Sequence, residues 1–419
     1  MMKPNFMEKL LDGVEVEWKK LGDFCELSGT GIDKKIKSNE TSVMLLNYMD
    51  VYRNNKITKN IITMKVTTTP KKIAQCDLRK GDVFITPTSE TKEDIGHASV
   101  VEENIAGAVY SYHLMRIRLL RKDVSPYFIK YLFRSNIIQK QILKKATGLT
   151  RYGLSKGNFI SLLFPIPPIH IQTEIVRILD TFTELTAELT AELTAELTAR
   201  KKQYTYYRDQ LLTFAEGEVE WKTLGDVGQL VRGNGLPKTD FTENGVPAIH
   251  YGQIYTYYGA FTTETKSFVS YETAKKLKKV NIGDVVITNT SENLKDVGKA
   301  VVYLGKVQAV TGGHATIFKP SNRILSKYFG YFTQTEMFAS QKRKYAKGTK
   351  VIDVSATDMS KIKIPIPPLS EQKRIVAILD KFDALTNSIT EGLPREIELR
   401  KKQYEYYRNM LLSFPKKDV

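Results

Sequence analysis

The chain has 419 residues, a formal net charge of +17, five histidines and only two cysteines, Cys25 and Cys76. This length suits two or three domains with a sizeable core, and the charge favours a polyanionic partner such as nucleic acid. The composition excludes a disulfide scaffold and a cysteine zinc site. No apolar run is long enough to span a bilayer, so we expect no membrane contact and a reducing cytoplasm as the compartment.

The N-terminal segment, residues 1–17, is predicted to be the end of a helix followed by a connector. LLDGVEVEW, ending at Trp18, is similar to LLTFAEGEVEW, ending at Trp221. The first segment therefore completes a repeat that behaves as if it were cyclic. We expect the two ends of the chain to lie close together.

Two blocks with different sequences begin at Trp18 and Trp221, after these similar segments. Each block is predicted to be a small mixed α/β domain. They share WK-x-LGD at Trp18 and Trp221 and GDV-x-IT at Gly81 and Gly283, while most of the remaining sequence differs. β-branched runs predict strands, and apolar residues at helical spacing behind Ser125 and Ser326 predict N-capped helices. The expected strands are 83–86, 109–119, 285–288 and 310–318, and the expected helices are 125–145 and 326–347.

A long helix is predicted between the blocks, where Thr183 to Arg200 reads TELTAELTAELTAELTAR. Ala, Glu and Leu favour helix, and no Gly or Pro interrupts the run. The corresponding second segment keeps the apolar period of four but contains Gly392 and Pro394, which predict a kink or break there. The residues expected to pack the two helices together are Leu185, Leu189, Leu193, Leu197, Leu385, Ile389, Leu393 and Ile397.

The chain is an internal duplication with an offset of 200 residues. PIPPIHIQTEIVRILDTF at Pro165 corresponds to PIPPLSEQKRIVAILDKF at Pro365, and RKKQYTYYR at Arg200 to RKKQYEYYR at Arg400. Two copies favour a pseudo-twofold molecule over a solenoid, which needs at least three repeats. The predicted divisions are a connector (1–17), a first block (18–165), a first long helix (166–214), a connector (215–222), a second block (223–365) and a second long helix with tail (366–419).

Signatures of catalysis are missing from the sequence. It has no GxxxxGK[ST] phosphate loop, no HExxH and no paired metal spacing among the histidines. Asp82 with Glu90 and Lys92 loosely resembles a nuclease set, but the second copy has Leu294 at the lysine position. Because the two blocks differ where shared chemistry would require agreement, recognition is favoured over catalysis, and no catalytic or metal-binding residue is predicted.

Basic loops and amide-bearing segments are predicted to contact DNA, since Lys and Arg neutralise phosphates and Arg, Asn, Gln and His pair with base edges. The notable clusters lie in TGLTRYGLSKGNF and KGTKVIDVSATDM and in the helices before them, where Lys342 also lies. The candidates are Arg53, Asn54, Asn55, Lys56, Ser89, Lys92, Lys144, Lys145, Thr147, Arg151, Tyr152 and Lys156 in the first block, and His250, Gln253, Tyr255, Ser291, Lys295, Arg343, Lys344, Lys347, Thr349 and Lys350 in the second.

With the two PIPP segments at Pro165 and Pro365, the TAEL run and the two RKKQY-x-YYR segments, the chain resembles the specificity subunits of type I restriction–modification enzymes, in the branch with TAEL repeats. The resemblance implies two target recognition domains, each binding one half of a split site in double-stranded DNA, held apart by two long antiparallel coiled-coil helices. It implies a non-catalytic chain in a complex that is a site-specific deoxyribonuclease and adenine-N6 methyltransferase.

The resemblance also implies partners. Two methyltransferase subunits would bring S-adenosylmethionine, and motor–nuclease subunits would bring ATP and Mg²⁺, with no cofactor on this chain. The alternatives are a self-contained nuclease or methyltransferase with built-in recognition domains, and a structural coiled-coil protein. The first would need a further catalytic domain, for which no stretch is left, and the second does not explain the two α/β blocks.

Overall fold

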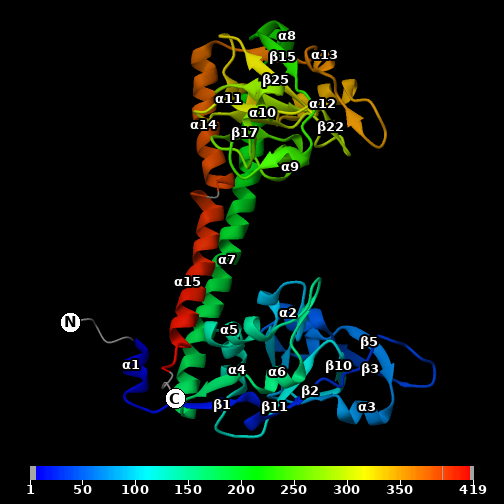
Figure 1. Ribbon diagram of the computed structural model, residues 1–419, viewed down its shortest axis with the longest axis vertical. Coiled ribbons are helices and arrows are strands. Elements are labelled where there is room, and N and C mark those ends of the chain that lie inside the picture. The colour runs from blue at the N-terminus through cyan, green and yellow to red at the C-terminus, as the bar shows by residue number, and fades with distance from the viewer. Residues whose placement is uncertain (1–5, 389, 416–419) are drawn as a thin grey trace. The chain divides into compact units, whose positions relative to one another are not determined.

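The computed structural model describes residues 6–388 and 390–415, and it confirms the predicted mixed α/β class with two globular blocks and long helices (Figure 1). The chain forms two compact units. Unit 1 contains residues 1–190 and 399–419, and unit 2 contains residues 191–398. Each unit therefore joins one block and the start of its own long helix to the end of the other long helix.

In unit 1, the sheets of the first block pack beside the start of the long helix α7 (Figure 1). The strands are β1 (Glu17–Lys20), β2 (Cys25–Ser28), β3 (Thr41–Leu46), β4 (Lys56–Ile57), β5 (Met64–Thr68), β6 (Asp77–Leu78), β7 (Val83–Ile85), β8 (Thr88–Ser89), β9 (Ala98–Val101), β10 (Ile105–Tyr110), β11 (Met115–Leu119), β12 (Tyr152–Gly153) and β13 (Leu163–Ile166). The helices that begin in it are α1 (Phe6–Leu11), α2 (Tyr48–Arg53), α3 (Pro70–Gln75), α4 (Pro126–Phe133), α5 (Asn136–Lys145), α6 (Lys156–Ile160) and α7 (Ile169–Leu211).

Unit 2 has the same plan on a different sequence. Its strands are β14 (Glu220–Thr223), β15 (Gly228–Arg232), β16 (Phe241–Thr242), β17 (Val246–Ile249), β18 (Phe261–Thr262), β19 (Ser267–Val269), β20 (Lys278–Val280), β21 (Val285–Thr288), β22 (Thr290–Ser291), β23 (Ala300–Tyr303), β24 (Ala309–Thr311), β25 (Ala315–Pro320), β26 (Ile352–Asp353) and β27 (Lys363–Ile366). Its helices are α8 (Leu224–Val227), α9 (Tyr251–Thr256), α10 (Tyr271–Lys276), α11 (Ser326–Phe332), α12 (Glu336–Tyr345), α13 (Ala356–Met359), α14 (Leu369–Asn387) and the first turns of α15 (Gly392–Leu411).

The strand orders of the two units correspond. Unit 1 has a five-stranded sheet β2-β11-β7-β9-β4 and a four-stranded sheet β5-β3-β10-β6, and unit 2 has β15-β25-β21-β23-β18 and β16-β19-β17-β24-β20. The predicted strands 83–86 and 285–288 are confirmed as the buried strands β7 and β21. The duplication therefore extends to the blocks, where the sequence similarity is weak.

The predicted strands 109–119 and 310–318 are wrong as single elements. The first is β10 and β11 around a turn in which the Leu114 amide donates to the Ser111 carbonyl at 3.0 Å. The second is β24 and β25 around a turn at Gly312, whose carbonyl accepts from the Ala315 amide at 3.2 Å. Polar or small residues that close these turns separate strands that belong to different sheets.

The predicted helices 125–145 and 326–347 are each two helices. The side chains of Ser135 and Thr335 cap α5 and α12, which start new helices after α4 and α11. Ser125 caps α4 as predicted. Ser326 does not cap α11, because its hydroxyl donates to the Gly283 carbonyl at 2.5 Å.

The long helix over the TAEL run is confirmed, since α7 is a continuous helix of 43 residues. The predicted break in the second helix is also confirmed: α14 ends at Asn387 and α15 begins at Gly392, where φ is +77°. Pro394 lies in the first turn of α15, where its missing N–H costs nothing. Among the residues the structure describes, no helix is both long enough and apolar enough to cross a bilayer.

The helices pair through aromatic residues within each unit. In unit 1, Phe182 stacks on Tyr407 at 5.6 Å between ring centroids, and the hydroxyls of Thr183 and Tyr404 lie 3.0 Å apart, which is an antiparallel register. Because these side chains fill the seam, Leu185 does not pack as predicted and is 56% exposed. A four-residue apolar period drifts by about 40° per step, which moves this leucine off the seam.

The other predicted packing residues are half-buried: Leu189, Leu193, Leu197, Leu385, Leu393 and Ile397. Ile389 lies outside the described residues. The leucine stripe is therefore a partly covered surface rather than a sealed core.

The expectation that the chain ends lie close together is confirmed for the described residues. Met7 and Leu11 of α1 share the core of unit 1 with Leu412 and Phe414. The indole Nε1 of Trp18 donates to the Pro415 carbonyl at 3.2 Å.

A buried glutamine joins each block to its long helix. The Gln172 amide oxygen accepts from the Ser125 amide at 2.8 Å, and its Nε2 donates to the carbonyls of Asp123 at 2.9 Å and Pro167 at 2.7 Å. Gln372 makes the matching three bonds in unit 2, and both glutamines are fully buried. Each side chain thus satisfies three backbone groups where the block meets the helix.

Gln172→Leu is expected to lower the free energy of unfolding by about 3 kcal/mol, because three backbone groups that are buried or half-buried lose their hydrogen-bond partner. The check is the midpoint of urea denaturation, with Gln210→Leu at an exposed position of α7 as the control. Equal midpoints for the two variants would mean that the hydrogen bonds of Gln172 do not stabilise the fold.

Candidate nucleic-acid interface

The loops before the two PIPP segments are closed by the same backbone hydrogen bonds in both units. In unit 1 the amide of Thr147 donates to the Gly153 carbonyl at 3.0 Å, and the reverse bond is 2.8 Å. In unit 2 the same pair of bonds joins Lys347 and Asp353, at 2.9 and 2.8 Å. The closing strands β12 and β26 then pair with β8 and β22. The two basic loops are therefore held on the sheets and not free in solvent.

In unit 1, five of the predicted residues come together here. Nε and Nη2 of Arg151 both lie 3.2 Å from the Thr88 hydroxyl, and the Lys92 ammonium lies 5.3 Å from the Tyr152 ring centroid. The remaining two lie beside them: Thr147 pairs with Gly153 at the base of the loop, and Ser89 on β8 pairs with Tyr152. A shallow pocket of about 390 Å³ is lined by Thr88, Thr147, Arg151, Tyr152, Leu154 and Ser155.

Helix α2 is fastened to the same strand. The Tyr48 hydroxyl donates to the Thr88 carbonyl at 2.9 Å, and its ring stacks on Tyr52 at 5.9 Å. Sequence reasoning missed Tyr48 and Thr88. The signal was present, since NYMDVY and HYGQIY carry tyrosine at the same two positions and TSE occurs in both blocks.

The four candidates at the end of α2 have different environments. Arg53 and Asn55 are exposed, whereas Asn54 Nδ2 donates to the Asp50 carbonyl at 2.7 Å. The Lys56 ammonium lies 3.5 Å from the Asp180 carboxylate on α7. The structure thus gives Lys56 a partner on the conserved helix and leaves Arg53 and Asn55 available to a ligand.

The lysines around the first loop also differ. Lys144 and Lys156 are exposed, and Lys145 donates to the Ser161 hydroxyl at 2.5 Å. Two of the three side chains therefore present their ammonium groups to solvent, while the third is held against its own block.

In unit 2, two candidates have internal roles that differ from the predicted base contact. His250 is 5% exposed, and its Nδ1 accepts from the Gly252 amide, which caps α9. Gln253 donates to the Ser267 hydroxyl at 2.5 Å. Burial lowers the pKa of His250, so the ring is held neutral.

The surface of unit 2 that matches α2 and β8 consists of aromatic and hydroxyl groups. The Tyr255 hydroxyl donates to the Thr290 carbonyl, and the Thr290 hydroxyl lies 3.0 Å from His314 Nδ1. The Tyr251 ring lies 4.8 Å from the His314 ring. Sequence reasoning singled out Tyr255 but not Tyr251, Thr290 or His314. Ser291 is half-buried on β22 beside them.

Five basic candidates of unit 2 and the neighbouring Thr349 are all exposed; the basic ones are Lys295, Arg343, Lys344, Lys347 and Lys350. Lys347 also lies 3.0 Å from Asp358, and Arg343 pairs with Glu336. The expected phosphate contact of Lys342 is wrong. That ammonium is buried and donates to the carbonyls of Lys295 at 3.1 Å and Val297 at 2.6 Å, and burial lowers its pKa to about 8.

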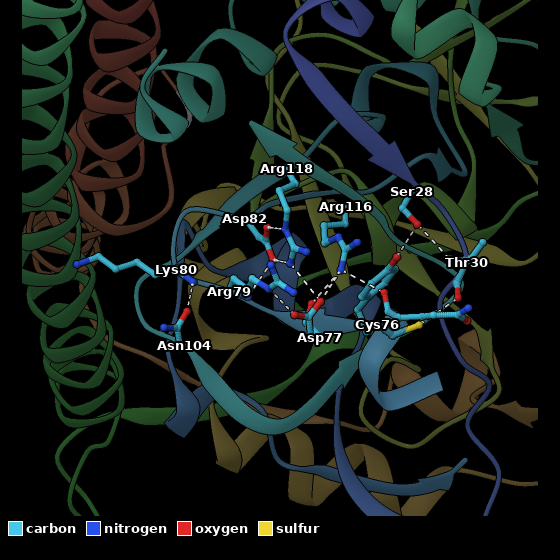
Figure 2. A network of polar contacts seen from close by, with 12 residues as sticks. Ser28, Thr30, Cys76, Asp77, Arg79, Lys80, Asp82, Asn104, Arg116 and Arg118 are labelled. Atoms are coloured by element: carbon cyan, nitrogen blue, oxygen red, sulfur yellow. Dashed lines mark hydrogen bonds and ion pairs between the residues drawn. The ribbon is translucent and has the colours of Figure 1, made fainter. Parts of the chain in front are cut away.

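The acidic residue that resembled part of a nuclease set is structural. Figure 2 shows Asp82 beside Arg118, whose Nε and Nη2 donate to the carboxylate at 2.7 Å each. Arg118 and Arg116 also reach Asp77, at 3.2 and 3.0 Å, which ties β11 to β6. The Asp82 carboxylate raises the pKa of the Arg118 guanidinium. Over residues 6–388 and 390–415, no group of three His, Cys, Asp or Glu side chains is placed to hold a metal ion.

Comparison with known proteins gives one family. Residues 13–199 and 216–399 match the model described as the type I restriction modification DNA specificity domain. The specificity subunit of the type I restriction enzyme EcoR124I/EcoR124II from Escherichia coli is 35% identical over 433 residues, covering 100% of this chain and 99% of the relative.

Two solved structures share the fold. A chain from a structure describing complex assembly and conformational transition of the type I R-M system has a TM-score of 0.66 at 17% identity, with 98% of each chain covered. The HsdS subunit of Thermoanaerobacter tengcongensis has a TM-score of 0.54 at 19% identity, covering 96% of this chain and 98% of that one.

Proposed function

The chain belongs to the family of type I restriction–modification DNA specificity subunits, and we propose that each of its two target recognition domains binds one half of a split DNA site. It is the DNA specificity subunit of such a system and is itself non-catalytic. The observation that carries the proposal is the pair of loops with one backbone frame and different side chains. Two loops with the same backbone hydrogen bonds but different side chains are suited to two domains that bind different bases.

The proposed recognition domains are residues 18–165 and 223–365. The long helices, 166–214 and 366–419, hold them apart, and the connectors are 1–17 and 215–222. Supporting this division, β1 pairs with β13 and β14 with β27, so each block begins and ends at one place in the fold.

The proposed DNA-binding residues are those members of the predicted set with exposed or half-buried side chains around the two basic loops and the ends of α2 and α9. In unit 1 these are Arg53, Asn55, Lys92, Lys144, Thr147, Arg151, Tyr152 and Lys156. In unit 2 they are Tyr255, Ser291, Lys295, Arg343, Lys344, Lys347, Thr349 and Lys350. The basic side chains would neutralise phosphates, while hydroxyl and aromatic groups position the strands.

We propose that two methyltransferase subunits dock on the long helices and supply S-adenosylmethionine, and that motor–nuclease subunits supply ATP and Mg²⁺. The repeated RKKQY-x-YYR segments support two equivalent docking sites, because Tyr206 and Tyr406 are 61% and 66% exposed in otherwise paired helices. The free, buried thiols of Cys25 and Cys76 suit the reducing cytoplasm.

The test is to purify the chain with methyltransferase subunits and map the methylated adenines in DNA exposed to the complex. A split site with a fixed spacer is expected. Cleavage or methylation by the purified chain alone, with all cofactors present, would favour the self-contained enzyme.

Charge reversal at Lys144, Lys145 and Lys156 is expected to weaken binding to all sequences. It should also flatten the dependence of log K on log salt by about 0.9 for each phosphate that is no longer neutralised. The measurement is fluorescence anisotropy at several salt concentrations, with Lys65, Lys71 and Lys80 reversed as a control of equal charge. An unchanged slope in the Lys144, Lys145 and Lys156 variant would mean that these lysines do not contact phosphates.

A further inference from the structure

Leu149 is the most exposed of the large apolar side chains described in residues 6–388 and 390–415, at 93%. It lies at the tip of the first basic loop, between Gly148 and Thr150. Single exposed apolar residues are common on proteins and by themselves indicate nothing. This one is distinguished by the loop that holds it and by the charges around it.

The backbone of the loop that carries Leu149 is constrained. The two backbone bonds between Thr147 and Gly153 close it at the base. Gly148 has φ of +139°, and a Cβ there would lie 2.0 Å from the Arg151 carbonyl oxygen. This conformation is open only to glycine, so the tip is held in a fixed shape with its apolar side chain in water.

The surroundings of the tip are suited to a polyanion. Arg151 lies two residues away and is fixed against the Thr88 hydroxyl, and Lys92 lies over the Tyr152 ring. Lys144 is exposed at the end of the helix that leads into the loop. Contacts of these cations with phosphates would bring the tip to a groove of the duplex. A leucine gains nothing from a phosphate, and in a groove the largest apolar surfaces open to it are those of the bases.

The second unit repeats the arrangement with another side chain pattern. Gly348 has φ of +105°, and a Cβ there would also lie 2.0 Å from a loop carbonyl, that of Val351. Val351 is 60% exposed and takes the position of Arg151, while Thr349 takes that of Leu149. Both tips thus expose one apolar side chain, at different places on the same frame.

We propose that Leu149 in unit 1 and Val351 in unit 2 enter a DNA groove and make an apolar contact with a base of their half-site. The contact is to the 5-methyl group of a thymine or to the face of a base in an opened step, both of which lose water against an apolar side chain. This inference rests on the proposed function and makes these two residues determinants of sequence specificity.

The experiment uses the full chain in complex with its methyltransferase subunits, on a duplex carrying the mapped site and on an unrelated duplex. Leu149→Ala is expected to weaken binding to the site by about tenfold to a hundredfold, with unchanged affinity for unrelated DNA and an unchanged salt slope. Leu120→Ala, at a leucine of the same unit that is 69% exposed, should leave both affinities unchanged. Methylome mapping of Leu149→Ala should show relaxed choice at one position of one half-site only.

Equal binding to the site by Leu149→Ala and the parent would overturn the proposal. An equal loss of affinity on both duplexes would overturn it too. If the methyltransferase subunits no longer purify with the variant, the loop tip contacts those subunits instead of DNA, and the proposal is also overturned. If the parent itself does not prefer the mapped site, the proposed function fails instead, and this outcome is visible before any variant is tested.

Two further measurements separate the two kinds of base contact. Replacing each thymine of the half-site by uracil removes one methyl group at a time, and a position where the parent loses affinity but Leu149→Ala does not would identify a methyl contact. A 2-aminopurine in the half-site whose fluorescence rises with the parent and not with Leu149→Ala would identify an opened step. Silence in both measurements would overturn a direct base contact.

Discussion

Replacing residues 20–160 with the corresponding block of another family member is expected to change one half of the recognised sequence completely and to leave the other half unchanged. The structure gives a reason for this modularity in unit 1. Because β1 pairs with β13, the two points where the chain enters and leaves the block lie side by side. The chain thus enters and leaves the block at one place, and the loops that we propose contact DNA lie wholly within the block.

The incoming block must reproduce three contacts that the parent block makes with α7. The Tyr131 hydroxyl donates to the Asp180 carboxylate at 2.5 Å, and the Ser125 amide donates to Gln172. In unit 2, the Tyr331 hydroxyl donates to Asp380 at 2.6 Å, and the Leu325 amide donates to Gln372. The third contact is apolar, through the buried face of α4, which shares its core with residues of α7. A donor block with tyrosine at the matching position is therefore expected to fold on the parent helix.

The measurement is methylome mapping of the chimera beside the parent. The reciprocal replacement of residues 223–365 is the control, and it should change the other half-site alone. A chimera in which both halves change would mean that the blocks determine the sequence jointly.

The long helices were predictable because their signal is local. The TAEL composition specifies helix over the middle of α7, and the repeat at an offset of 200 residues locates its counterpart. The break before Gly392 followed from Gly and Pro alone. The splitting of 125–145 into α4 and α5 was not predictable in this way, since Arg134 and Ser135 interrupt neither the apolar period nor the helix propensity.

The inward position of Lys342 shows where a reading by residue type fails. With the offset of 200, Lys342 corresponds to Ile142, which is fully buried and contacts Gly96. Lys342 lies against Gly298, the corresponding glycine, with its Cδ 3.1 Å from where a Cβ would lie. Lys342 lies in a run of basic residues, and its sequence neighbours suggest a surface position. Only the alignment of the two copies, which places it at the buried Ile142, indicates that it is internal.

His250 shows the same limit for the base-reading candidates. It occupies the N-cap of α9, as Asn47 does for α2, and each side chain accepts a backbone amide of its helix. The residue types that pair with base edges are also those that cap helices, so composition alone cannot separate the two roles. Exposed residues at the loop tips are stronger candidates for DNA contact, because they have no structural role inside the domain.

Deleting one TAEL unit, Thr194 to Leu197, is expected to abolish methylation of the parent site and to create a site whose half-sites are unchanged and whose spacer is shorter. Four residues removed from the continuous helix α7 shorten it by about 6 Å, and DNA offers steps of about 3.4 Å per base pair. We therefore expect the spacer to shrink by one or two base pairs. The second helix carries a break before Gly392, which gives that connection a place to adjust.

The deletion length matters because it also rotates the helix. Four residues turn it by one full turn plus about 40°, so the half-buried leucines can still meet their partner, whereas two residues turn it by about 200°. Deleting Leu197 and Thr198 alone should therefore lower the urea midpoint and abolish methylation, and this variant is the matched control. Each base pair removed also rotates the second half-site by roughly a tenth of a turn, which the helix break or a small DNA twist must absorb. If the four-residue variant methylates the parent site with the parent spacer, the length of α7 does not set the spacing, and the repeat contributes only helix.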